Sequence, residues 1–316
     1  MSKKQTRRSA IFYAVTTFDE KGTIDEAAYR LQLGRLRDAG LPVYIAGPGL
    51  GAAYLLSSDE RDRLFAVAIE ELKGKVPCRA GGREPNSADQ VIEFLQAAER
   101  AGMDAAQVYS LELGHGAKPT YPEMEKFYST VIESTSLPLY LSCHHSSGYV
   151  PPVKLLATLV EKYPHVAGIH YGGTDLRFLL ELIERFSDRI EVHCAGVFNA
   201  ATILTLGGCG FMGAEGNIAP QLFAEVIRSF DSGDWDGFKK SYKQLLSLYS
   251  AVFQFNGNAS AQRGIKPLMN AFGLPAGAVV PPMVPISDVD LAALVTAVDK
   301  IGIPELAGRA NPRFTQ

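Results

Sequence analysis

The sequence predicts an α/β fold, a (β/α)8 TIM barrel followed by a C-terminal helical extension. A short apolar run rich in strand-forming residues, a Gly-rich or polar loop and then apolar residues at helical spacing follow one another eight times along the chain. Strict alternation of this kind implies parallel strands. Eight such units close most economically into a barrel.

Each unit contributes one strand and one helix, in chain order. We expect the strands at 10–16, 43–47, 77–80, 105–109, 138–142, 166–170, 190–194 and 209–213. We expect the helices near 25–39, 58–73, 87–101, 121–134, 152–162, 174–186, 198–206 and 218–230.

Capping and acidic residues support these helix starts, because side-chain oxygens there satisfy free backbone N–H groups. They occur at 58–60, 87–89 and 174–175. Glycines at 40, 102 and 207 fit the left-handed conformation that commonly ends a helix.

The strand pattern stops after residue 232, and three further helical stretches follow. We therefore divide the chain into a disordered tail at 1–9, the barrel at 10–231 and a C-terminal helical extension at 232–316 that packs on the barrel. The apolar run AIFYAV that follows the basic first eight residues is too short for a membrane span and has no small-residue cleavage site, so we expect no membrane or export signal there.

Composition points to a small-molecule partner. The chain has 316 residues, 47% of them hydrophobic and 21% charged, and a formal net charge of −3. These values are ordinary for a globular protein and argue against nucleic acid or an anionic membrane as the partner. The four cysteines are scattered without metal-type spacing, so we expect reduced thiols and a cytoplasmic location.

Histidines gather at the predicted carboxyl ends of the strands, where a barrel of this kind forms its active site. His170 ends the sixth strand in the stretch VAGIHYGGTDL, and His165 alone falls at the opposite mouth. One such residue alone is more often a hydrogen-bonded loop histidine. The group at the catalytic mouth is His115, His144, His145, His170 and His193.

Glu112 and Glu215 follow strand ends at the same mouth. A histidine and a carboxylate that share a partly desolvated cavity can separate their pKa values and act as base and acid near neutral pH. The same residue types could instead bind a divalent metal, but no HxH or HExxH spacing is present. We expect no metal and no other cofactor.

Two glycine-rich loops are candidates for holding a carboxylate or phosphate through backbone N–H groups. The first comprises Gly49, Leu50, Gly51 and Ala52, and the second includes Gly172 and Gly173 at a predicted helix start. Simple turn chemistry would need the same glycines. Arg83, on the loop after the third strand, would add a fixed positive charge, and Tyr109 ends the fourth strand.

The motifs VTTF (15–18), LPLYLS (137–142), VAGIHYGGTDL (166–176), GGCGFMGAEGNIAP (207–220) and GIKPLMNAFGLPAGAVVPPMVPIS (264–287) resemble the dihydrodipicolinate synthase / N-acetylneuraminate lyase family. The resemblance runs from about residue 10 to residue 303. It implies a (β/α)8 barrel, a homotetramer or homodimer, and a lyase that acts next to the keto group of a 2-oxo acid or dehydrates a sugar acid.

The catalytic set departs from that family. The lysine that forms the Schiff base falls on His170, and the proton-relay tyrosine of strand five falls on Ser142. The loop that grips the substrate carboxylate aligns with PGLGA (48–52), which lacks its hydroxyls and acid. Thr16 and Thr17 fall on the family position that orients the relay. An imidazole cannot form the iminium that withdraws electrons, so the covalent step is unavailable at its usual place.

We therefore expect a lyase on a small carboxylate or 2-oxo acid that works without a Schiff base. His170 would be a general base or would polarise a carbonyl, with His144 or His115 and Glu112 or Glu215 exchanging protons, and Ser142 in the same catalytic set. The substrate would lie against the two glycine loops, Thr16, Thr17, Arg83, Tyr109 and His193. The alternatives are a metal-assisted lyase or hydrolase in the same barrel and an inactive homologue that binds a metabolite.

Overall fold

The computed structural model describes residues 8–144, 149–256 and 260–314, and it confirms the predicted fold class. Eight parallel strands close into a barrel in the order β1 to β8, with β1 paired to β8. The strands are β1 (Ser9–Tyr13), β2 (Val43–Ile45), β3 (Cys78–Ala80), β4 (Ala105–Val108), β5 (Leu139–Cys143), β6 (Val166–Tyr171), β7 (Glu191–Ala195) and β8 (Gly210–Gly213).

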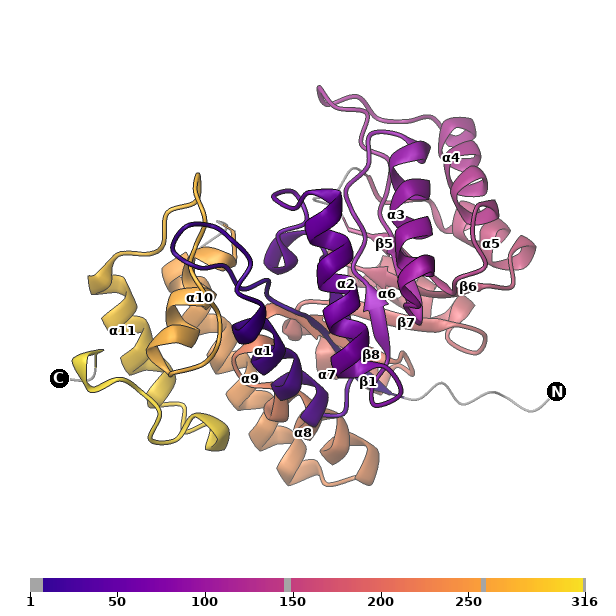
Figure 1. Cartoon of the computed structure of the whole chain (residues 1–316). Helices are drawn as coiled ribbons and strands as arrows, with labels where there is room; N and C mark the ends of the chain where they lie inside the picture. The colour runs from indigo at the N-terminus through magenta and orange to yellow at the C-terminus, as the bar shows by residue number, and fades with distance from the viewer. Residues whose placement is uncertain (1–7, 145–148, 257–259, 315–316) are drawn as a thin grey trace.

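Helices follow the strands and cover the outside of the barrel (Figure 1). They are α1 (Glu26–Asp38), α2 (Ser58–Leu72), α3 (Ala88–Ala101), α4 (Tyr121–Glu133), α5 (Val153–Lys162), α6 (Leu176–Phe186), α7 (Ala200–Thr205) and α8 (Pro220–Ser232). Three short 3-10 helices lie at strand ends: η1 (Gly49–Gly51), η2 (Val197–Asn199) and η3 (Ala214–Asn217).

The C-terminal part of the chain adds α9 (Trp235–Asn256), α10 (Gln262–Ala271) and α11 (Asp288–Asp299), with η4 (Pro304–Leu306) and η5 (Pro312–Phe314) after them. Helix α9 packs along α8, and α10 and α11 lie at one end of the molecule (Figure 1). The described helices include none that is long and apolar enough to cross a membrane.

The observed boundaries differ from the predicted ones by a few residues, each for a local reason. Strand β1 begins at Ser9, which was expected in the tail, because Ser9 pairs with Gly210 where the barrel closes. Ser57, and not Ser58, caps α2 through a reciprocal capping box with Glu60. Asp175, and not the residue before it, caps α6 with its carboxylate.

Alternation along the strands separates two environments. Val43 and Ile45 of β2 point outward into the large core between strands and helices. Tyr44 between them points inward and packs with Ile11 and Met212 in a separate small cluster. The barrel interior thus receives every second residue of each strand, and several of these residues are polar.

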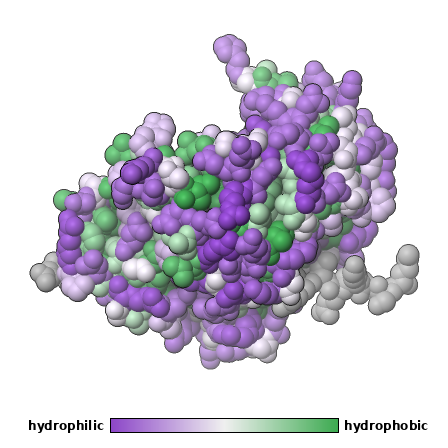
Figure 2. Space-filling model, in the orientation of Figure 1, coloured by the Kyte–Doolittle hydropathy of each residue, from purple (hydrophilic) through white to green (hydrophobic). Residues whose placement is uncertain are grey.

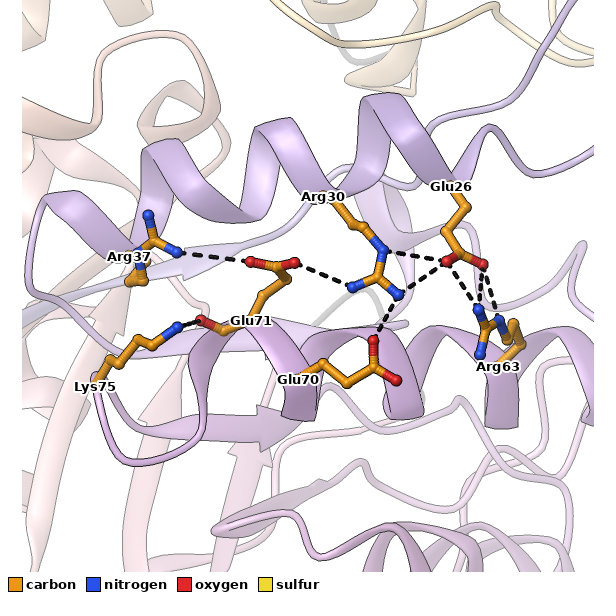
Figure 3. A network of polar contacts seen from close by, with 7 residues as sticks. All are labelled: Glu26, Arg30, Arg37, Arg63, Glu70, Glu71 and Lys75. Atoms are coloured by element: carbon orange, nitrogen blue, oxygen red, sulfur yellow. Dashed lines mark hydrogen bonds and ion pairs between the residues drawn. The ribbon is translucent and has the colours of Figure 1, made fainter.

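An ion-pair network joins the outer surfaces of α1 and α2 (Figure 3). Arg30 donates to Glu26 at 2.9 Å, to Glu70 at 2.6 Å and to Glu71 at 3.0 Å. Glu26 also accepts from Arg63. Because these groups reach solvent, the network adds little stability, and the burial of apolar side chains beneath it holds the helices. The face of the molecule in Figure 2 is mostly hydrophilic, with scattered apolar patches.

Replacing Phe65 with Ala should destabilise the barrel by about 3–5 kcal/mol. Phe65 of α2 is fully buried, and its ring meets that of Phe94 of α3 edge to face at a centroid distance of 5.7 Å. The free energy of unfolding in urea measures the loss. Leu31→Ala is the control, since Leu31 is 66% exposed and its loss should change stability by about 0.5 kcal/mol at most. Similar losses in the two variants would contradict this packing.

Candidate active site

A cavity of about 420 Å³ opens at the end of the barrel where the strands finish. We call the residues that the barrel strands contribute the strand side: Tyr13, Gln107, Ser142, His170, Ala195, Met212 and Gly213. We call the residues that α9 and α10 contribute the helix side: Tyr249, Val252, Phe253, Asn256 and Ile265. Barrels of this kind carry their active sites at this end.

About half of the residues expected at the site line this pocket. They come from separate loops and strands, which the closed barrel brings to one place. They are Gly49, Leu50, Tyr109, Ser142, His144, His170, Gly172 and Glu215.

His170 is the most unusual of them. Its side chain is 2% exposed, and neither ring nitrogen has a hydrogen-bond partner among the described residues. The imidazole stacks on Tyr140 at 5.0 Å between ring centroids and meets Tyr44 edge to face at 5.4 Å. Buried polar nitrogens are rarely left without a partner, so this imidazole is available to a ligand in the pocket.

The surroundings of His170 keep it uncharged. Burial, then the neighbouring His193, then the Arg79 guanidinium hold its pKa well below the ordinary value of 6.5. At neutral pH the ring is therefore a neutral imidazole with one N–H donor and one acceptor nitrogen. It can polarise a carbonyl or hydroxyl group, but it binds a proton poorly.

Tyr140 contacts both this ring and a buried cation. The guanidinium of Arg79 lies 4.2 Å from the centroid of Tyr140, on which the His170 ring also stacks. Arg79 is anchored by an ion pair with Glu191 at 3.3 Å. Sequence reasoning missed Arg79, although a charged residue at the middle of a three-residue apolar strand points into the barrel.

Glu215 contributes a buried carboxyl group to the pocket. It lies in η3 after β8 and is 5% exposed. Burial raises the pKa of its carboxyl group from 4.5 to about 7. The group is therefore divided between its protonated and ionised forms near neutral pH, as a proton-exchanging residue requires.

The position of the His144 ring requires a glycine at position 172. Its ring lies so close to Gly172 that a Cβ atom at position 172 would collide with the imidazole. The N–H of Gly172 donates to the carbonyl of Cys143 at 3.1 Å, so it cannot also hold a carboxylate as expected. Gly173 does not line the pocket, and a Cβ atom there would collide with the phenol of Tyr171.

The first glycine loop is held by its own hydrogen bonds. The N–H of Ala52 donates to the carbonyl of Gly49 at 3.0 Å. The buried hydroxyl of Thr16 donates to the carbonyl of Gly51 at 2.7 Å, and the hydroxyl of Thr17 donates to the backbone carbonyl of Asp25 at 2.6 Å. Thr16, Thr17, Gly51 and Ala52 therefore support the pocket from outside its lining, which corrects the expected substrate contacts.

Four other expected residues also lie outside the pocket lining. Strand β7 continues to Ala195, so His193 lies deeper in the barrel, with Nε2 at 3.0 Å from the hydroxyl of Ser9. Glu112 accepts a hydrogen bond from the N–H of Gly114 within its own loop. The guanidinium of Arg83 lies 3.8 Å from the carboxylate of Glu93 on α3. His115 is exposed to solvent. His145 is outside the described residues.

The helix side was absent from the sequence-based site. Tyr249, Val252 and Phe253 recur at spacings of three and four, which places them on one face of α9. That pattern was visible in the sequence, but nothing in it indicated that this face meets the barrel mouth.

The charged residues of the described lining are few. Glu215 is the one Asp, Glu, Lys or Arg side chain among them, so no lysine of the described chain lines the pocket. Lys266 of α10 is buried elsewhere, where its Nζ donates to the carbonyls of Thr16 and Ala278 at 2.8 Å each. Within the described ranges, no three His, Cys, Asp or Glu side chains group as a metal site.

Comparison with known proteins agrees on one family. The sequence model of the dihydrodipicolinate synthetase family matches residues 7–301. The 4-hydroxy-tetrahydrodipicolinate synthase of Methanopyrus kandleri is 29% identical over 239 residues, which are 75% of this chain and 78% of the relative.

Two solved structures show the same fold. A prophage protein of Escherichia coli K12 from the dihydrodipicolinic acid synthase family, in complex with pyruvate, has a TM-score of 0.85 and 24% identity. That match covers 94% of this chain and 99% of the other. N-acetylneuraminate lyase from Fusobacterium nucleatum has a TM-score of 0.80 and 19% identity over 93% and 98% of the two chains.

Replacing Glu215 with Gln should remove a pH dependence of stability. The pKa of this carboxyl is about 7 in the folded protein against an ordinary 4.5, so the folded state binds the proton more tightly. The protonated carboxyl therefore contributes on the order of 3 kcal/mol to the free energy of unfolding below about pH 4.5. This contribution is lost as the pH rises through about 7. Urea unfolding at about pH 5 and pH 8 should show a larger loss in the wild type than in Glu215→Gln. Equal losses would contradict the burial of this carboxyl.

Replacing Arg79 with Met should raise the pKa of His170, because one of the positive charges that disfavour its protonation disappears. The pKa should stay below its ordinary value, since burial remains. NMR titration of the imidazole resonances measures it. Arg83→Met is the matched control, because that guanidinium faces Glu93 outside the barrel and its loss should leave His170 unchanged. A lower pKa of His170 in Arg79→Met would contradict this effect of the Arg79 charge.

Proposed function

Since the chain belongs to the dihydrodipicolinate synthetase family, whose members are lyases, we propose that it is a lyase for a small 2-oxo acid or related carboxylate and works without a Schiff base. The reaction is the cleavage or formation of a carbon–carbon bond, or a hydration or dehydration, next to the keto group. The pocket at the strand ends is its site.

The observation that carries this proposal is the state of His170. In the family resemblance, position 170 corresponds to the Schiff-base lysine. Here it holds a buried imidazole whose two nitrogens have no hydrogen-bond partner in the described chain. No lysine lines the same cavity among the described residues, so an amine to form the imine is lacking there.

A noncovalent lyase needs to stabilise the enolate that forms when a bond next to the keto group breaks. The N–H of the neutral His170 ring would donate to the keto oxygen and stabilise the developing charge. A neutral imidazole suits this role because it is not drawn into binding the proton itself. This choice favours the polarising role of His170 over that of a general base.

Glu215 would exchange the proton at the reacting carbon or oxygen, since its pKa of about 7 allows it to give and take a proton at neutral pH. Ser142 and His144 would orient the substrate. With no Lys or Arg in the described lining, neutral donors such as Ser142 and Gln107 would hold the carboxylate. Gln107 accepts from the phenol of Tyr13 at 3.0 Å, which fixes its amide plane.

We extend the proposal to assembly and location. Large apolar side chains such as Leu176, Phe198 and Leu206 are 46–56% exposed, which supports a homodimer or homotetramer. The four cysteines are free and buried, in keeping with a reducing, cytoplasmic location. Sedimentation equilibrium tests the first point, and a single-chain mass would contradict it.

Enolisation can be measured without knowing the natural substrate. We expect the wild type to catalyse exchange of the C3 protons of 2-oxobutanoate with deuterium, followed by NMR in D₂O. Glu215→Gln and His170→Phe should each slow the exchange by about 10²-fold or more. His115→Ala is the control, since that exposed residue lies outside the pocket lining and its loss should leave the rate unchanged. A protein that binds 2-oxobutanoate without exchange would be an inactive metabolite-binding homologue.

Borohydride distinguishes the noncovalent mechanism from the covalent one. Treatment of the wild type with 2-oxobutanoate and borohydride should leave the protein mass unchanged, because no imine forms for reduction. A stable adduct on any lysine would overturn the proposal.

A further inference from the structure

The helix side of the pocket is mostly apolar and aromatic. Tyr249, Val252 and Phe253 of α9 and Ile265 of α10 line it, and the amide of Asn256 at the end of α9 is its one Asn or Gln side chain. The hydrogen-bonding side chains Gln107, Ser142 and His170 belong to the strand side. A ligand that fills the cavity therefore meets most of the hydrogen-bonding groups on the strand side and mainly apolar and aromatic groups on the helix side.

Two rings of the helix side stack on each other. Tyr249 and Phe253 lie nearly parallel, with an interplanar angle of 10° and 5.9 Å between centroids. Phe253 is 46% exposed, so much of its ring is free for contact with a ligand. Phe198 supports the pair from outside, meeting Tyr249 edge to face at 4.7 Å, and does not line the cavity.

The cavity is also larger than a 2-oxo acid of three or four carbons requires. Its volume of about 420 Å³ lies in the range of roughly 300–1,000 Å³ that holds drug-sized ligands. A short 2-oxo acid at the strand side would leave the helix side in contact with water. An apolar group of the substrate that covers these rings would gain the free energy of burying them.

We propose that the substrate carries an aromatic group, which packs on Tyr249 and Phe253 while its 2-oxo acid end faces His170 and Ser142. This inference rests on the proposed function and specifies the substrate class of that site. The helix side then selects the substrate, and the strand side acts on its keto group.

Calorimetric titration of the full chain with three compounds tests this. 2-Oxobutanoate has the keto acid without a ring, 2-oxo-4-phenylbutanoate adds the ring, and 4-phenyl-2-butanone keeps the ring but replaces the carboxylate with a methyl group. We expect the phenyl acid to bind about tenfold or more tightly than 2-oxobutanoate. Phe253→Ala should reduce that preference by about tenfold. The control Trp235→Ala should retain it, since this exposed ring of α9 packs on Phe230, outside the pocket lining.

Several outcomes would overturn the inference: equal binding of the two acids, no binding of the phenyl acid, or a preference that survives Phe253→Ala. A change of oligomeric mass in Phe253→Ala would assign the ring to a contact between copies and would also overturn it. The ketone separates this inference from the proposed function. If it binds as tightly as the phenyl acid, the aromatic contact stands and the carboxylate substrate fails.

Discussion

The desolvation of one imidazole is the constraint on which the pocket depends. His170 points into a closed barrel whose interior already holds the guanidinium of Arg79, so a second positive charge there would be costly. The ring stays neutral for that reason. Tyr44 and Tyr140 pack on it without offering hydrogen bonds, which leaves its nitrogens for a group that enters from the pocket.

The rest of the fold places other groups around that ring. Parallel closure brings Ser142 beside His170 in register, and the turn after β8 buries Glu215 at the same mouth. Helix α10 holds the opposite rim, because Gln262 donates to the carbonyl of Gly49 at 2.6 Å and Lys266 to that of Thr16. The C-terminal helices thus shape the pocket as well as covering the barrel.

Sequence periodicity was sufficient for the barrel, because each strand and helix carries its own pattern of apolar residues and caps. It was also sufficient to place His170 and Glu215 at the pocket, because both follow short apolar runs. It failed for His193 because the strand continues two residues beyond it, and for Glu112, whose carboxylate caps its own loop. It also missed Arg79, although a charge in the middle of a short apolar strand was a local signal. It missed Phe253 because the approach of α9 to the barrel mouth leaves no such signal.

The most direct test of the role of His170 is the ¹⁵N NMR spectrum of its ring, recorded near neutral pH without ligand and with 2-oxobutanoate. A neutral ring that donates to the keto group predicts two distinct nitrogen signals, one protonated and one not, and a shift of the protonated nitrogen when the acid binds. Two equivalent signals of an imidazolium, or a spectrum unchanged at saturation, would contradict it.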